Sequence, residues 1–244
     1  MSRWPAGYRV VELAEVDSTN AEARRRAAAG EPGPLWIAAA RQTKGRGRRG
    51  REWIAPPGNL SATLLLYPGR TANDCAQLSF VAALAAGDML ARHVGGISLK
   101  WPNDVLAAEK KIAGILIESE TGSDGTAIWV GIGIGVNLKA FPDDTDLPAT
   151  AVAALGGAAP SPQDALIDLA DAFAKWYDAW REGGFAAIRS GWLARAHGLG
   201  RRIRVRLARE ELTGTFRDID ETGALVLGLP GGVTRTIAAG EVFF

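Results

Sequence analysis

The chain has 244 residues, with 28 Lys and Arg against 27 Asp and Glu, and 47% of its residues are hydrophobic. This composition is typical of a globular chain with one large domain, or a large and a small one, and it excludes disordered and fibrous proteins. The net charge of +1 provides no overall positive field, so binding to nucleic acid or anionic lipid requires a local patch. The one cysteine, Cys75, excludes an intramolecular disulfide and a four-thiolate zinc site.

The N-terminus has no uninterrupted apolar run, and no segment reaches the roughly 18 apolar residues that a membrane span needs. We therefore expect a cytoplasmic protein that does not associate with membranes.

Hydrophobic periodicity predicts most secondary structure. In chain order we predict a strand at 8–16, a helix at 20–29, strands at 35–40 and 60–67, a helix at 74–93, strands at 97–101, 105–106, 112–117 and 127–136, and a helix that begins at Ser161. Thr19 and Glu22 have capping-box spacing, which predicts that the Thr19 hydroxyl accepts from an amide of the first turn.

After about residue 198 the pattern changes to short strands separated by turns. Four strands are predicted, at 201–207, 212–216, 224–229 and 233–237. Closely spaced short strands of this kind are typical of a small β-barrel. The predicted organisation is therefore one domain at 1–197 and a second at 198–244.

The most distinctive segment is the arginine-rich glycine loop at 41–51, in which six of eleven residues are basic. Gly45, Gly47 and Gly50 match a dinucleotide fingerprint literally, but that motif must open a helix, and here the chain continues into Pro56 and Pro57. Three interpretations remain open from composition: binding of a polyphosphate or acyl phosphate, a nucleic-acid contact, and a solvated charged loop. A second basic cluster at 201–206 keeps the nucleic-acid interpretation open.

Three further segments carry possible chemistry. Lys100-Trp101-Pro102-Asn103-Asp104 ends with a carboxylate that suits a hard cation such as Mg²⁺, or forms an ordinary Asn-Asp turn. Lys111 precedes a very apolar strand, where it can present a charge to an anion or protect a sheet edge. The alternation of glycine with β-branched residues at 131–137 suits a ligand lying against the backbone, or close packing.

Together these segments resemble the biotin protein ligases, which attach biotin to a lysine of biotin-dependent carboxylases. The resemblance covers nearly the whole chain and follows the family order at 17–20, at Gln42 with 45–53, and at 100–104, 111–118 and 133–137. It implies an α+β fold, with a mixed-sheet catalytic domain flanked by helices, as in class II synthetases, and an SH3-like C-terminal β-barrel. It also implies that biotin and MgATP form biotinyl-5′-adenylate, from which the acceptor lysine takes the biotinyl group.

The resemblance also implies roles for individual residues. Lys111, Arg48 and Arg51 match catalytic residues, and Asp104 matches a metal-binding group. The implied biotin contacts are Ser18, Thr19, Asn20, Gln42, Gly45, Arg46, Gly47, Arg48, Lys111, Gly114 and Gly135. The implied nucleotide contacts are Arg48, Arg51, Trp53, Lys100, Lys111 and Asn137.

The implied cofactors are ATP and Mg²⁺, and the implied partner is the biotin carboxyl carrier domain of acetyl-CoA carboxylase. Only 17 residues precede the Ser-Thr-Asn segment, so we expect a monofunctional ligase without a DNA-binding domain and without DNA as a partner. A monomer or weak homodimer is expected. The alternatives are lipoate attachment, which the arginine loop disfavours, and a non-enzymatic nucleic-acid-binding module that uses both basic clusters.

Overall fold

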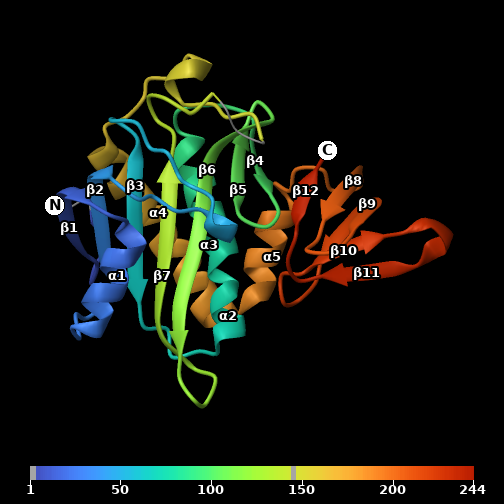
Figure 1. The fold of residues 1–244 in the computed structure, drawn as a ribbon, viewed down its shortest axis with the longest axis horizontal. Coiled ribbons are helices and arrows are strands. Elements are labelled where there is room, and N and C mark those ends of the chain that lie inside the picture. Colours follow the sequence, from blue (N-terminus) through green and yellow to red (C-terminus); the bar gives the residue numbers. More distant parts are fainter. Residues whose placement is uncertain (1–3, 144–146) are drawn as a thin grey trace.

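A computed structural model describes residues 4–143 and 147–244. Its main element is a seven-stranded sheet in the order β1-β2-β3-β7-β6-β5-β4 (Figure 1). The strands are β1 (Arg9–Val16), β2 (Leu35–Gln42), β3 (Leu60–Leu66), β4 (Ile97–Lys100), β5 (Asp104–Ala107), β6 (Lys110–Thr121) and β7 (Ala127–Val136). Only the β1–β2 pair is parallel among the described pairs of this sheet, so the predicted mixed sheet is confirmed.

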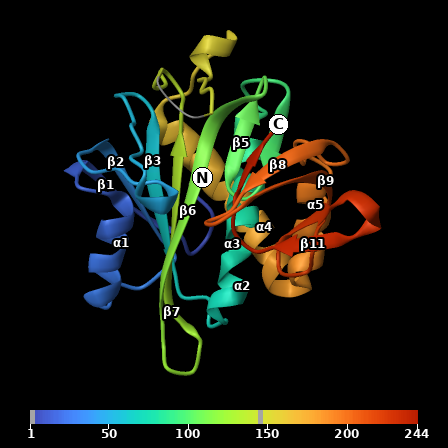
Figure 2. The same ribbon diagram turned by 45° about the vertical axis from the view of Figure 1, so that its right-hand side comes forward.

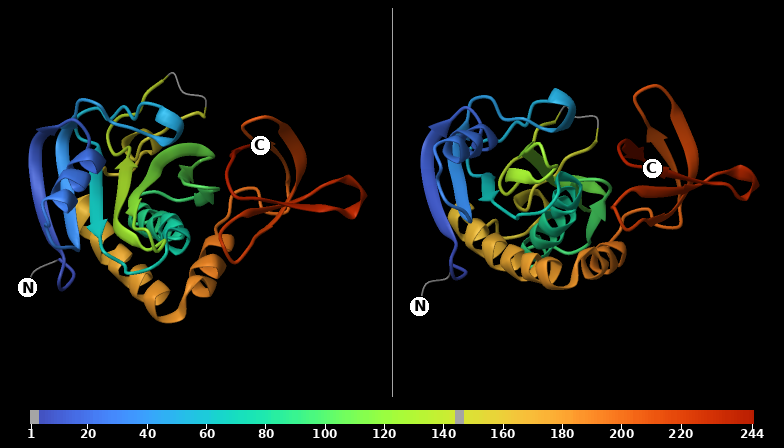
Figure 3. Two further views of the ribbon diagram at one scale, coloured as in Figure 1. Left: turned by 60° about the horizontal axis from the view of Figure 1, so that its bottom comes forward. Right: turned by 90° about the horizontal axis from the view of Figure 1, so that it is seen from below.

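Helices lie on both faces of this sheet. They are α1 (Thr19–Ala28), α2 (Ala72–Ala76), α3 (Leu78–Leu90), α4 (Pro162–Gly183) and α5 (Phe185–Leu193). In Figure 1, α1 lies in front of the sheet and α3 and α4 lie behind it, and Figure 3 shows α4 and α5 running along the rear face. The described residues also form short 3₁₀ segments, η1 (Arg48–Gly50), η2 (Ala153–Leu155) and η3 (Pro230–Gly232).

The alternation of side chains along β2 explains how both faces are covered. Leu35 and Ile37 are fully buried and pack with Ala23 of α1. Trp36, between them, points to the other face and meets the Phe173 ring of α4 edge-on, with ring centroids 6.0 Å apart. The larger core therefore lies on the α3 and α4 side, and the front face stays accessible beyond α1.

Two local predictions for the helices need correction. The predicted helix at 74–93 is two helices, broken at Gln77, whose side-chain oxygen accepts a hydrogen bond from Trp180 Nε1 at 2.9 Å. The capping box is wrong as well, because Ser18 is the N-cap of α1 and forms no side-chain cap bond. The hydroxyl of Thr19 instead lies in a buried polar cluster with Gln42 and Thr63.

The C-terminal segment forms a five-stranded antiparallel sheet in the order β11-β10-β9-β8-β12. Its strands are β8 (Arg202–Arg206), β9 (Glu211–Ile219), β10 (Leu225–Gly228), β11 (Thr234–Ile237) and β12 (Glu241–Phe243). The prediction missed β12. Within the described residues no pairing joins β11 to β12, so the sheet is open where a closed barrel was expected; Figure 1 shows β10 and β11 extending away from the molecule.

The C-terminal sheet lies beside α5 (Figure 2), and side-chain contacts help to hold it against the large domain. Phe80 of α3 lies edge-on to Phe185 and Trp192 of α5, with ring centroids 5.2 and 5.4 Å away. Trp101 donates from its indole Nε1 to the main-chain oxygen of Gly223, in the β9–β10 turn, at 3.0 Å. The domain boundary between residues 197 and 198 stays a prediction. No described helix is long and apolar enough to span a membrane.

Phe80 connects these elements, so its truncation tests the packing. We expect Phe80→Ala to lower the free energy of unfolding by about 3–5 kcal/mol, because it leaves a cavity among aromatic rings. Urea unfolding measures this change. Ile128→Ala is the control, since Ile128 is 52% exposed. A loss below about 1 kcal/mol for Phe80→Ala would mean that the rings are not tightly packed.

Candidate active site

A cavity of about 420 Å³ opens on the front face of the large sheet, beyond α1. Its wall is formed by the start of α1, the arginine loop around η1, the β4–β5 turn, the β6 and β7 strands, and β12 of the C-terminal sheet. Among the residues that line it are Ser18, Thr19, Asn20, Gln42, Arg46, Gly47, Arg48, Arg51, Trp53, Lys100, Asp104, Lys111, Gly114, Gly135 and Asn137. Segments that are distant in sequence therefore meet at one place.

The floor of the cavity is a strip of backbone without side chains. Gly114 of β6 and Gly135 of β7 are register partners on adjacent strands. The Trp53 indole lies against both, and a Cβ atom added at Gly135 would collide with its ring. At Gly135 the missing side chain therefore gives room to the Trp53 ring, as the close-packing interpretation of this motif predicts. The interpretation with a ligand against the backbone stays a prediction.

One end of the cavity gathers positive charge around a buried carboxylate. Asp104 Oδ1 lies 2.6 Å from the Nζ of Lys111, and Oδ2 lies 3.4 Å from the Nζ of Lys100. Lys100 and Asp104 face each other across the β4–β5 hairpin, and Lys111 comes from the next strand, β6. Arg48 adds a third cation and donates from Nη1 to the Asn103 side-chain oxygen at 3.2 Å.

Burial and charge act against each other in this cluster. Burial disfavours the charge on Asp104, but Lys111 and Lys100 outweigh it and hold the pKa of Asp104 below its usual range. Burial also lowers the pKa of Lys100, and together with neighbouring arginines it lowers the pKa of Arg48. With three cations around one carboxylate, the cluster has a net positive charge, which a bound anion would offset.

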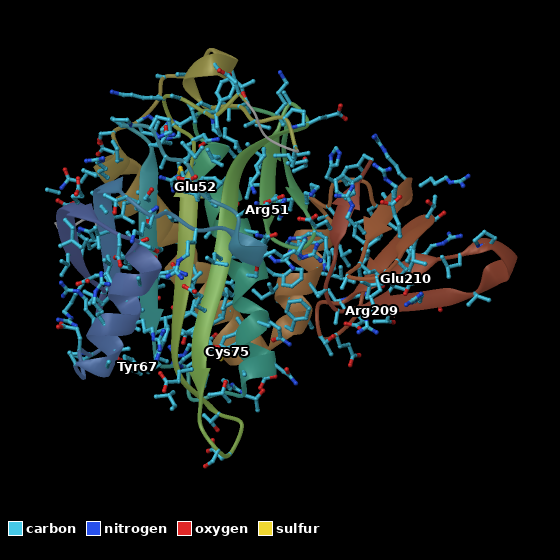
Figure 4. The ribbon with its side chains drawn as sticks, viewed as in Figure 1. Arg51, Glu52, Tyr67, Cys75, Arg209 and Glu210 are labelled. Atoms are coloured by element: carbon cyan, nitrogen blue, oxygen red, sulfur yellow. The ribbon has the colours of Figure 1, made fainter. Side chains whose placement is uncertain are left out.

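The arginine loop is tied to the C-terminal sheet. Arg51 forms an ion pair with Glu241 of β12, and Arg49 Nη1 lies 3.5 Å from the same carboxylate. Figure 4 shows Arg51 where the loop meets the C-terminal sheet. Sequence reasoning missed Glu241, because it belongs to no motif and lies 190 residues from Arg51.

The other end of the cavity is polar but lacks such a cation cluster. The Gln42 side-chain oxygen accepts from the Thr19 main-chain N–H at 2.8 Å and lies 3.1 Å from the Thr19 hydroxyl. Asn20 donates from Nδ2 to Glu118 Oε2 at 2.8 Å. Thr63, fully buried on β3, lies between Thr19 and Asn20. This end offers neutral hydrogen-bonding groups rather than concentrated charge.

Two buried polar atoms beside the glycine strip have no hydrogen-bond partner among the described residues. They are Trp53 Nε1, a donor, and Asn137 Oδ1, an acceptor. Asn137 is only 2% exposed, and its Nδ2 already donates to the Thr150 main-chain oxygen at 3.1 Å. Unpartnered buried groups are costly, so both atoms are suited to a bound molecule with acceptors and donors of its own.

Comparison with known proteins identifies the family. Residues 13–137 match the biotin/lipoate A/B protein ligase family, and residues 198–244 match the C-terminal domain of biotin protein ligases. A biotin–[acetyl-CoA-carboxylase] ligase of Paracoccus denitrificans is 47% identical over 95% of this chain and 99% of its own length. The chain belongs to the biotin/lipoate A/B protein ligase family.

Other members of this family support the assignment. A biotin–[acetyl-CoA-carboxylase] ligase of Mycobacterium tuberculosis is 34% identical, over 97% of this chain and 90% of its own. The solved biotin protein ligase from Aquifex aeolicus, in complex with biotin and ATP, is 28% identical with a TM-score of 0.81. That likeness covers 96% of this chain and 97% of the other.

The structure brings the sequence-predicted site residues together, with one difference. Gly45 is not among the residues that line the cavity, and a Cβ atom added there would collide with the Trp53 main-chain oxygen. Of the two adjacent lysines, Lys111 lies in the cavity and Lys110 is exposed. The roles assigned to these residues stay predictions.

The contribution of Asp104 to stability can be measured. We expect Asp104→Asn to destabilise the fold by about 3 kcal/mol at pH 7, because two lysines then lie close together without their carboxylate. Urea unfolding of both chains measures this difference.

The difference should also depend on pH. The pKa of Asp104 is lower in the folded chain than in the unfolded chain. The contribution of Asp104 to the free energy of unfolding is therefore complete above a pH of about 4. This stabilisation is lost as the pH falls through the lower pKa that Asp104 has in the folded chain. Equal free energies of unfolding at pH 7 would contradict the account of the cluster.

Proposed function

We propose that this chain is a biotin protein ligase that activates biotin with ATP and transfers it to a lysine of a carrier protein. The observation that carries this proposal is the arrangement of the cavity, with neutral hydrogen-bonding groups at one end, cations at the other and a glycine strip between them. Biotin has the same order: a cyclic urea, a hydrocarbon chain and a carboxylate. Family membership and the ligases of Paracoccus and Mycobacterium support the same activity.

In the first half-reaction, a carboxylate oxygen of biotin attacks the α-phosphorus of ATP, and the bond to pyrophosphate breaks. Both reactants are anions; at 4 Å two unit charges repel by about 4 kcal/mol at an effective dielectric constant of 20. Lys111, held by Asp104, lies at the cationic end and offsets this repulsion. Arg48 and Arg51 line the same end and are placed to contact the phosphates.

In the second half-reaction, the amine of the acceptor lysine attacks the acyl carbon of biotinyl-5′-adenylate, and AMP leaves. Lys100, buried beside Asp104, keeps positive charge near the departing phosphate. The arginine loop and β12 border the cavity, where they are placed to limit the access of water to the mixed anhydride.

In the part of the chain that the structure describes, the protein's own groups do not form a metal cage. Among the described residues no cluster of three metal-ligating side chains occurs, and both oxygens of Asp104 contact lysines. The assignment of Asp104 to Mg²⁺ therefore stays a prediction that this geometry does not favour. We infer that Mg²⁺ arrives bound to the ATP phosphates, as is usual for this ion, and we assign no residue to it.

The finer expectations from the sequence remain part of this proposal. We propose the biotin carboxyl carrier domain of acetyl-CoA carboxylase as the acceptor, with no DNA partner, a monomeric or weakly dimeric state and a cytoplasmic location. The proposed domains are 1–197 and 198–244.

One incubation tests the activity. The purified chain is mixed with labelled biotin, MgATP and a biotin carboxyl carrier domain, with a lipoyl domain as the control acceptor. We expect label on the carrier domain alone, together with biotin-dependent pyrophosphate release. Label on the lipoyl domain would indicate lipoate-type acceptor choice. No label and no pyrophosphate would contradict the proposal, and salt-sensitive binding of nucleic acid would then favour the alternative function.

Single substitutions test the cationic end. We expect Lys111→Ala to lower the rate of pyrophosphate release at least about 100-fold, because it removes a preorganised charge from the reacting phosphate. Arg48→Ala should weaken retention of the adenylate, so that more of it appears free in solution. The matched control is Lys110→Ala, whose side chain is exposed and outside the cavity, and which should keep the normal rate. Unchanged adenylation and retention in both site variants would remove these assignments.

A further inference from the structure

A chain of hydrogen bonds runs behind the neutral end of the cavity. It starts at Glu118 of β6, passes through Asn20 of α1 and Thr63 of β3, and ends at Thr19, which lines the cavity. Neither Glu118 nor Thr63 lines the cavity itself. Thr63 is fully buried and Asn20 and Thr19 are each 4% exposed, so three members are shielded from water.

The end at Glu118 determines the direction of the first bonds. A carboxylate and a main-chain carbonyl can only accept, so the Nδ2 of Asn20 must face Glu118 Oε2, at 2.8 Å, and the Leu116 oxygen, at 3.3 Å. The Asn20 Oδ1 then faces Thr63 and can only accept. Thr63 has one hydroxyl proton and donates it to Asn20 Oδ1, at 2.6 Å.

The other end is also determined by a group with a single role. The main-chain N–H of Thr19 can only donate, so the amide oxygen of Gln42 must face it. The Thr19 hydroxyl therefore lies between two acceptors, Gln42 Oε1 and the Thr63 oxygen, at 3.1 and 2.8 Å. It gives its one proton to either of them, and a lone pair of its oxygen is left for the cavity.

The same constraint orients Gln42. With its oxygen used by Thr19, its Nε2 is a donor for which the structure shows no acceptor among the described residues. This end of the cavity therefore presents an acceptor at Thr19 beside a donor at Gln42. A cyclic urea has the complementary pair, an N–H beside a carbonyl oxygen.

We propose that Glu118 is a positioning residue that acts through Asn20 and Thr63 to keep Thr19 an acceptor, and so sets the preference for a ring with a urea N–H. The identity of that ring rests on the proposed function. An aliphatic ring without an N–H leaves Thr19 unpaired, and a ring oxygen in place of the N–H puts two lone pairs against each other. A ligand with either of these rings should therefore bind more weakly than a ligand with a urea N–H.

The test compares biotin with two analogues of the same shape on the full chain, by calorimetry. Each analogue is a cyclic carbamate in which one of the two urea N–H groups is replaced by a ring oxygen. We expect at least one of them to bind folded wild-type protein about tenfold or more weakly than biotin. Equal affinity of the wild-type protein for biotin and both carbamates would overturn the inference, independently of the affinities of the variants.

Variants then test the members of the chain. Thr63→Val keeps the shape and removes the hydroxyl, and Glu118→Leu removes the acceptor. Each should weaken biotin binding about tenfold, and the double variant should be about as weak as the weaker single variant, because both interrupt one chain. The KM for ATP at saturating biotin should stay within about twofold. Glu118→Gln should restore most of the affinity, since its amide oxygen can accept from Asn20.

The matched control is Glu120→Leu on the same strand. Glu120 accepts from Trp129 Nε1 at 3.0 Å, so this variant also removes a carboxylate and a hydrogen bond, but not from the chain behind the cavity. It should bind biotin normally. Thermal unfolding identifies variants that have lost their fold, and the carbamate comparison needs none of them.

Two outcomes separate this inference from the proposed function. Wild-type protein that neither binds nor adenylates biotin would defeat the proposed function. Wild-type protein that does both, with Thr63→Val and Glu118→Leu unchanged in biotin affinity, would defeat this inference alone.

Discussion

Repulsion between like charges is the constraint on which the rest of this structure depends. Lys100, Lys111 and Arg48 lie together at one end of a cavity, and burial works against the charge of both Lys100 and Arg48. Asp104 makes the arrangement possible because it contacts both lysines. Asp104 carries one negative charge against the three positive charges of these side chains, so the cluster has a net positive charge. In the proposed function, this charge offsets the repulsion between the two reacting anions.

The architecture serves this arrangement from several directions. The β4–β5 hairpin and β6 supply the lysines and Asp104, while the arginine loop supplies Arg48. Glycines on adjacent strands clear a flat strip for Trp53 and for what binds beside it. The C-terminal sheet contributes Glu241, which pairs with the loop arginines and thereby connects that sheet to the reacting end.

The sequence was sufficient for much of the fold, because period-two and helical patterns reflect burial directly. It also located most of the cavity lining, since motifs such as 45–53 and 100–104 place several functional groups close together in the chain. Thr63, Glu118 and Glu241 were not found as site residues, because each acts through a partner from a distant element. The capping box failed for the same reason: tertiary partners took the Thr19 hydroxyl.

The central claim concerns the charge of the bound acid, and carbon-13 NMR of biotin labelled at its carboxyl carbon tests it most directly. The titration uses the full chain without nucleotide, over the acid range in which the protein stays folded. If the biotin carboxylate binds at the lysine cluster, the pKa of this carboxyl group in the complex lies below its pKa in free biotin. Lys111→Ala then raises the pKa of the bound carboxyl group toward that of free biotin. A bound carboxyl group that titrates as it does in water would contradict the account.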